Sequence, residues 1–207
     1  MLTVGFDLDM TLVDSRPGIA ATYRLLAALT GVEIDTDAVV ARLGPPLEQE
    51  IARWYPQEQV TDAVTRFRAL YPDHAVVPSP ALPGAAEALA AVRAAGGRVL
   101  VVTAKMPGLA ELHLRHLGFP FDELYGFAWA DGKSEALRAA GATAFVGDHV
   151  ADMAAARDAG VFGIGVTTGP CSAGELVVAG ADVVLPDLRG FPPLLARIHL
   201  GHGVSGG

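Results

Sequence analysis

The chain has 207 residues, of which 51% are hydrophobic and 18% are charged, a composition typical of a folded domain and not of a disordered chain. Its net charge of −8 argues against general binding to nucleic acids or acidic membranes, although a small anionic ligand can still bind where the local charge is positive. Its apolar runs are shorter than the ~18 residues of a membrane span, and we expect no secretory signal. The one cysteine, Cys171, excludes an intrachain disulfide and fits a reducing, cytoplasmic location.

Strand and helix patterns alternate along most of the chain. Continuous apolar runs, which are typical of parallel strands covered on both faces, predict strands at Met1–Phe6, Arg98–Thr103, Leu124–Trp129, Thr143–Gly147, Val161–Val166 and, at the end, Asp182–Leu185. Helical patterns lie at Pro83–Ala95, Gly108–Leu117, Lys133–Ala140, Val150–Ala159 and Leu188–Ile198. The alternation predicts an α/β fold with a doubly wound, Rossmann-like parallel sheet.

One long segment interrupts this alternation. Between Arg16 and Ala81 only helical patterns occur, at Ile19–Leu29, Thr36–Leu43, Leu47–Trp54 and Val60–Leu70. We therefore expect an inserted α-helical cap domain at residues 16–81, a core made of residues 1–15 and 82–200, and a flexible, Gly-rich tail at residues 201–207.

Polar side chains follow several predicted strands. Asp7 and Asp9 leave the first strand, and because side chains alternate along a strand they point the same way. Two like charges so close together require a positive partner between them, or a proton on one of them. Thr103, Ala104 and Lys105 end the second strand, Asp148, His149 and Asp152 follow the fourth, and Lys133 begins the helix before it. Because ligands of open parallel sheets bind outside the carboxyl ends of the strands, these groups are expected to converge.

Four motifs carry a resemblance to a known family. They are DLDMT from Asp7, VVTAK from Val101, the lysine Lys133 and GDHVAD from Gly147, and AARDAG from Ala155 supports them. With these motifs the chain resembles the haloacid dehalogenase-like (HAD) hydrolases, in the phosphoglycolate-phosphatase-like branch that has a helical cap after the first strand. Met10 stands where glycine is commoner in the family, a difference from which we expect little effect.

The resemblance implies a chemistry for these motifs. Asp7 would be the nucleophile, forming an aspartyl-phosphate, and the positive species between the carboxylates would be Mg²⁺. The metal ligands would be the side chains of Asp7 and Asp148 and the backbone carbonyl of Asp9. The Asp9 side chain would then be available to protonate the leaving alcohol and later to deprotonate the attacking water.

Further residues take supporting roles in this interpretation. Thr103 and Lys133 would bind the phosphoryl oxygens, with Lys105 as the competitor for the lysine role. Asp152 would act through water or by orienting Lys133, and Thr11 would fix the loop geometry. A halide leaving group needs no proton, so the presence of Asp9 favours phosphate chemistry over dehalogenation.

Substrate selectivity is expected to map to the cap. The segment Leu43–Leu47, with Gly44 at its centre and Arg42 beside it, is the candidate substrate-facing loop, and Ala104, Lys105 and His149 are further candidates for substrate contact. The interpretation is a small, phosphoglycolate-like phosphate ester as substrate. The histidines His113 and His116 share a helix and are expected to be solvated.

Three alternatives stay open at this point. A phosphomutase of the same branch would use the same residues, a pyrophosphatase would cleave another phosphorus bond, and a non-catalytic module would only bind a phosphorylated ligand. The expected partner is a small phosphorylated metabolite, with no nucleic acid and no membrane. The sequence indicates neither the individual substrate nor the oligomeric state.

Overall fold

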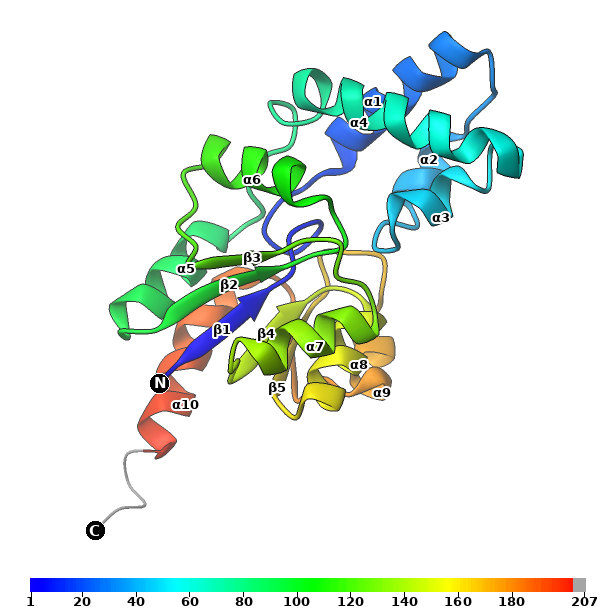
Figure 1. The fold of residues 1–207 in the computed structure, drawn as a ribbon. Coiled ribbons are helices and arrows are strands. Elements are labelled where there is room, and N and C mark those ends of the chain that lie inside the picture. The colour runs from blue at the N-terminus through cyan, green and yellow to red at the C-terminus, as the bar shows by residue number, and fades with distance from the viewer. Residues whose placement is uncertain (203–207) are drawn as a thin grey trace.

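A computed structural model describes residues 1–202 of the chain and the side chains of residues 1–197. Six strands form one sheet in the order β3-β2-β1-β4-β5-β6, and all neighbouring pairs are parallel (Figure 1). The strands are β1 (Thr3–Phe6), β2 (Arg98–Val102), β3 (Glu123–Tyr125), β4 (Ala144–Gly147), β5 (Phe162–Val166) and β6 (Val183–Leu185). This order confirms the doubly wound α/β fold.

Helices cover both faces of the sheet. The helices of the core are α5 (Ala85–Ala94), α6 (Pro107–His116), α7 (Asp131–Ala139), α8 (Val150–Ala159), α9 (Ala173–Ala179) and α10 (Phe191–His202). Along β2, Val99 and Val101 pack in one hydrophobic cluster with residues of α5, α6 and α10, whereas Leu100 and Val102 pack in another with α7 and α8. The alternation of side chains along a strand therefore builds two apolar layers, one on each face.

The remaining helices form the cap. They are α1 (Arg16–Thr30), α2 (Thr36–Val40), α3 (Leu47–Ile51), the short 3-10 helix η1 (Gln57–Gln59) and α4 (Val60–His74). The four α-helices share a hydrophobic cluster of their own, into which Met106 and Leu109 of the core also pack. Figure 1 shows this group beyond the carboxyl ends of the strands, with α1 and α4 farthest from α10. The inserted helical cap is thus confirmed, while its limits at residues 16 and 81 stay a prediction.

The structure corrects two predicted boundaries. β3 ends at Tyr125 and does not continue to Trp129, because the chain turns at Phe127, whose φ is 55°, and the next amide, Ala128 N, donates to Thr103 O at 2.9 Å. A short 3-10 helix, η2 (Leu188–Gly190), precedes α10, which therefore begins at Phe191 and not at Leu188.

Two helical segments also differ from the prediction. The sequence analysis contains no helix corresponding to α9, although Ser172 and Glu175 form a capping box at its start. Toward the end of the chain, α10 includes Gly201 and His202, the first two residues of the expected tail, and residues 203–207 lie outside the described part, so the flexibility of the tail stays a prediction. None of the described helices has the length and apolar character needed to cross a membrane.

Candidate active site

The site lies at the point of the sheet where the order of the strands along the chain reverses. From β1 the chain moves first to β2 and β3 on one side, and later to β4, β5 and β6 on the other. Asp7 directly follows β1, and Asp148 directly follows β4, the neighbour of β1. In doubly wound sheets such a switch point leaves a crevice at the carboxyl ends of the strands, which is the usual place for a ligand.

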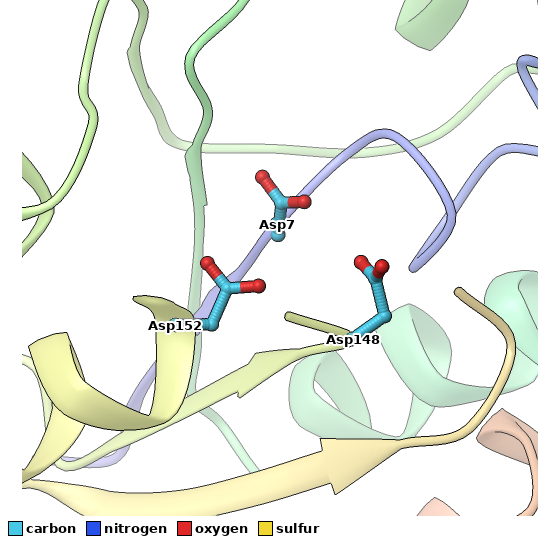
Figure 2. Close-up of side chains that lie close together, drawn as sticks. All are labelled: Asp7, Asp148 and Asp152. Carbon is cyan, nitrogen blue, oxygen red and sulfur yellow. The ribbon is translucent and has the colours of Figure 1, made fainter. Parts of the chain in front are cut away.

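Three carboxylates meet in this crevice. Oxygens of Asp7, Asp148 and Asp152 lie within 4.8 Å of one another, and the three residues are 6%, 2% and 0% exposed (Figure 2). Asp152 comes from the first turn of α8, which must pass close to β4. Gly147 permits this approach, because a Cβ there would lie 2.4 Å from the Cβ of Asp152. Asp7 and Asp148 are predicted from the sequence as metal ligands, and Asp152 as a residue that acts through water or orients Lys133. In the structure the Asp152 carboxylate lies as close as the other two.

Lys133 is the cation of this group. It lies in the first turn of α7, is 2% exposed, and its Nζ donates to Asp7 Oδ1 at 2.8 Å and to Asp152 Oδ1 at 2.6 Å. The other oxygen of Asp152 accepts a hydrogen bond from the His149 backbone N–H at 3.1 Å. Asp152 is therefore held by its own helix end and in turn holds Lys133 beside Asp7.

The buried charges do not balance. Burial, more than the neighbouring Asp152 and Asp9 carboxylates, raises the pKa of Asp7 from 3.8 to about 7, although Lys133 opposes this shift. Burial, together with Asp7 and Asp152, also raises the pKa of Asp148 well above its ordinary value. Burial lowers the pKa of Lys133, but Asp152 and Asp7 outweigh this effect and the pKa is raised, so the lysine stays charged. Three carboxylates beside one ammonium leave a net negative charge that a further cation can neutralise, and hard oxygen ligands suit a divalent cation.

Thr11 and Thr103 fix the neighbouring loops. Thr11 Oγ1 donates to Asp148 Oδ1 at 2.8 Å, so Thr11 orients a carboxylate of the cluster as well as belonging to the loop after β1. Thr103, 1% exposed, accepts a hydrogen bond at Oγ1 from the Lys105 backbone N–H at 3.2 Å. In the loop after β1, Met10 has a φ of 62°. This left-handed conformation is costly for a residue with a side chain and suits the glycine commoner in the family.

Asp9 is not free, contrary to the interpretation made from the sequence. Its carboxylate accepts a hydrogen bond from Lys105 Nζ in an ion pair whose side chains are 19% and 8% exposed. Burial raises the pKa of Asp9, but Lys105 outweighs burial and the pKa is lowered below its ordinary value. The two lysines that compete in the sequence analysis thus have different partners, because Lys133 binds Asp7 while Lys105 binds Asp9.

A cavity of about 90 Å³ extends from this site into the cap. Its core side includes Asp7, Asp9, Thr103, Ala104 and Lys105, and its cap side includes Arg42, Gly44 and the whole of the expected loop 43–47. Both sides therefore contain residues that the sequence analysis names as candidates for substrate contact. Tyr23, Glu50, Phe67, Arg68 and Tyr71 also line the cavity and are absent from those candidates. The two tyrosines and Phe67 have the helical spacing of ordinary core residues, and nothing in the sequence distinguishes Glu50 and Arg68 from surface charges.

Two histidines connect the cap to the core. A Cβ at Gly44, whose φ is 139°, would lie 2.9 Å from His149 Cδ2, so the cap loop rests against the core only because residue 44 is glycine. His113 is completely buried, which corrects the expectation that it is solvated, and its Nε2 is 2.9 Å from the hydroxyl of Tyr71 in α4. Burial, aided by Lys105, lowers the pKa of His113 to about 4, so the ring is neutral at pH 7.

Comparison with known proteins agrees with this geometry. Residues 4–166 match the family of haloacid dehalogenase-like hydrolases. The chain is 31% identical over 202 residues to the probable phosphatase IndB of Dickeya dadantii, with 87% of each chain covered. It is 33% identical over 214 residues to a plasmid-encoded phosphoglycolate phosphatase of Cupriavidus necator, with 94% of this chain and 93% of the relative covered.

A solved structure extends the agreement to the fold. The haloacid dehalogenase-like family hydrolase of Streptococcus pneumoniae superposes with a TM-score of 0.81 at 25% identity, covering 96% of this chain and 98% of that one. Sequence motifs, sheet order and cap thus agree with the comparisons, and the chain belongs to the haloacid dehalogenase-like hydrolases, in the phosphoglycolate-phosphatase-like branch.

Proposed function

We propose that the protein is a Mg²⁺-dependent phosphatase that hydrolyses a small phosphate monoester through an aspartyl-phosphate on Asp7. The observation that carries the proposal is the buried arrangement of Asp7, which lines the cavity, is hydrogen-bonded to Lys133 and belongs to a cluster of acidic side chains. The names of two relatives, a probable phosphatase and a phosphoglycolate phosphatase, support the same reaction.

Each residue of the site has a role in this mechanism. Asp7 attacks the phosphorus atom, and splitting the displacement into two steps lowers each barrier. Lys133, held by Asp152, and the Thr103 hydroxyl bind the phosphoryl oxygens on which negative charge is spread in the transition state. The side chains of Asp7 and Asp148 and the backbone carbonyl of Asp9 would hold Mg²⁺, which would neutralise the carboxylates and polarise the phosphoryl group.

Asp9 serves as the acid–base residue. In hydrolysis of the aspartyl-phosphate it takes a proton from the attacking water, and the ionised form that Lys105 favours is the form required for this step. In the first step Asp9 protonates the leaving oxygen with the proton that it took from water in the previous turnover. This step requires that substrate entry loosen the pair with Lys105, so that Asp9 keeps that proton.

The substrate is a small ester that the cavity between cap and core can enclose. Water that is excluded from such a cavity cannot attack the phosphoryl group in place of the single reacting water. Phosphoglycolate is the reference compound because one relative is named as a phosphoglycolate phosphatase.

A phosphomutase of the same branch is the second candidate, since a neighbour from Bacteroides vulgatus is named as a putative β-phosphoglucomutase. Analysis of the products formed from a sugar phosphate and its bisphosphate separates the two reactions. A cytoplasmic location stays a prediction from the sequence.

Asp7→Asn tests the nucleophile. The amide oxygen is a poor nucleophile, so turnover of every phosphate ester should fall by at least about 1,000-fold, while circular dichroism stays that of the wild type. Asp62→Asn, in an exposed pair with Arg66 on α4, is the control and should keep full activity. Substantial turnover by folded Asp7→Asn would remove Asp7 from this role.

The two lysines should differ in their effect on activity. Lys133→Met removes the cation beside the nucleophile and should lower kcat by ~100-fold or more, whereas Lys105→Met should cost far less. Because each substitution leaves a carboxylate without its partner, kcat must be referred to the folded fraction measured by urea unfolding. The reverse ranking would assign the phosphoryl-binding role to Lys105.

Metal binding should appear as a pH-dependent change in stability. Without divalent cations, folded Asp7 keeps a proton up to pH about 7 that the unfolded chain releases near 3.8, so its contribution to stability is complete at low pH and is lost as the pH rises to about 7. Relative to Asp7→Asn, wild type should lose up to about 4 kcal/mol of unfolding free energy over this range. Mg²⁺ should restore stability, and more at pH 8 than at pH 5. Equal stabilisation of wild type and Asp148→Asn by Mg²⁺ would contradict the metal assignment.

The cap loop should need a glycine at position 44. Gly44→Ala places a Cβ against His149 and strains the backbone, so the loop must move and kcat/KM should fall for every ester. Gly31→Ala is the matched control, because Gly31 also has a positive φ, 71°, yet its Cβ would meet no atom within 4 Å. Both variants lose a little stability from the backbone, but only Gly44→Ala should lose activity. Equal activities of the two variants would show that the loop does not need this contact.

A further inference from the structure

The positive charges of the cavity are all engaged by acidic side chains. Among the described lining residues, the cations are Lys105, Arg42 and Arg68. Lys105 pairs with Asp9, Arg42 Nη2 with Glu50 Oε1 at 2.6 Å, and Arg68 Nη2 with Glu48 Oε1 at 2.6 Å. Glu50 is fixed further by Trp54 Nε1, which donates to it at 3.0 Å. A carboxylate on the leaving group would therefore compete with an acidic side chain at each of these cations. Breaking the Lys105–Asp9 pair, whose side chains are only 8% and 19% exposed, is costly, whereas the Arg68–Glu48 pair, whose side chains are 25% and 49% exposed, is the weak one.

The rest of the cavity wall is largely apolar. The cap contributes Ile19, Val39, Leu43, Leu47 and Phe67, and the core contributes Met106 and Leu109. Such a wall suits the carbon skeleton of a leaving group and offers nothing to a second charge.

Tyr23 differs from the paired cations and the apolar residues of this lining, because it brings a polar group without a partner. It is 2% exposed, its ring packs against Phe67 at a centroid distance of 4.7 Å, and it lines the cavity. Its hydroxyl has no hydrogen-bond partner among the described residues, and an unpartnered buried hydroxyl costs free energy. Burial, and secondarily the Glu50 carboxylate, raises the pKa of Tyr23 far above its ordinary value, so the group stays a hydroxyl that can donate.

From the paired cations, the apolar wall and the Tyr23 hydroxyl, we propose that the leaving group is an uncharged alcohol whose remote polar atom accepts a hydrogen bond from Tyr23. The inference rests on the proposed phosphatase function and narrows its substrate class. Tyr23 is then a specificity-determining residue, which binds the leaving group and takes no part in phosphoryl transfer. Arg42, which lies beside the candidate substrate-facing loop, is then not the partner of a substrate carboxylate, since its guanidinium already donates to Glu50.

Matched esters test the charge preference. A short series consists of phosphoglycolate, its amide and isobutyl phosphate, which have nearly the same shape but carry a charge, a neutral acceptor and no acceptor. A longer series consists of meta-carboxyphenyl, meta-carbamoylphenyl and meta-isopropylphenyl phosphate. With Mg²⁺, kcat/KM of the amide should exceed that of the carboxylate by ~10-fold or more in the series whose length reaches Tyr23. Preference for the carboxylate in either series would overturn the inference.

Tyr23→Phe tests the hydrogen bond. It should lower kcat/KM of the preferred amide by ~3- to 10-fold, mainly through KM, and leave the isosteric hydrocarbon ester within about twofold. Its unfolding midpoint should be equal to or above that of the wild type, since an unpartnered hydroxyl is removed. Tyr55→Phe is the matched control, because the Tyr55 hydroxyl is 2.7 Å from Thr30 Oγ1 and does not line the cavity, so this variant should lose stability and keep the ester selectivity.

The outcomes separate the inference from the function on which it rests. If wild type hydrolyses the esters but Tyr23→Phe affects all of them equally or none, only the role of Tyr23 is overturned. If Tyr23→Phe lowers the unfolding midpoint as Tyr55→Phe does, its hydroxyl is structural and the inference fails. If no ester is hydrolysed with Mg²⁺, the phosphatase function itself is refuted and the inference falls with it.

Discussion

The burial of Asp7, Asp148 and Asp152 beside one ammonium, that of Lys133, is the constraint on which the site depends. Ionised carboxylates in a dry crevice repel one another and lose their hydration, so the arrangement persists only with protons or added positive charge. The raised pKa values of Asp7 and Asp148 express the first solution, and in the proposed function a bound divalent cation would supply the second. The same excess of negative charge that destabilises the metal-free protein would therefore favour binding of the divalent cation that the proposed reaction uses.

The fold brings the three carboxylates and Lys133 together. The sheet order brings the ends of β1 and β4 together, Gly147 lets α8 approach, and α7 starts beside them so that Lys133 reaches two carboxylates at once. Above them the cap closes a cavity through contacts such as Gly44 with His149 and Tyr71 with His113. In the proposed function the core would bind the phosphoryl group common to all phosphate esters, and the cap would surround the leaving group.

Residues tied to strand ends could be predicted from the sequence, because the end of an apolar run fixes both their place in the sheet and their direction. Asp7, Thr103 and Asp148 are of this kind. The pair between Lys105 and Asp9, and the burial of His113 against Tyr71, could not be predicted, since they depend on side-chain rotamers and on how the cap helices lie over the core. Helical periodicity marks Tyr23 as an inward-facing residue but carries no information on whether its hydroxyl finds a partner.

Covalent phosphorylation of Asp7 is the central chemical claim, and it can be observed directly. The protein would be mixed with Mg²⁺ and its best ester, quenched in acid within the first turnovers, digested and analysed by peptide mass spectrometry. The account predicts a phosphoryl group on the peptide that contains Asp7, located on that residue by fragmentation and absent when substrate or Mg²⁺ is omitted. A phosphoryl group on a different residue, or rapid turnover during which direct attack by water leaves every peptide unmodified, would contradict it.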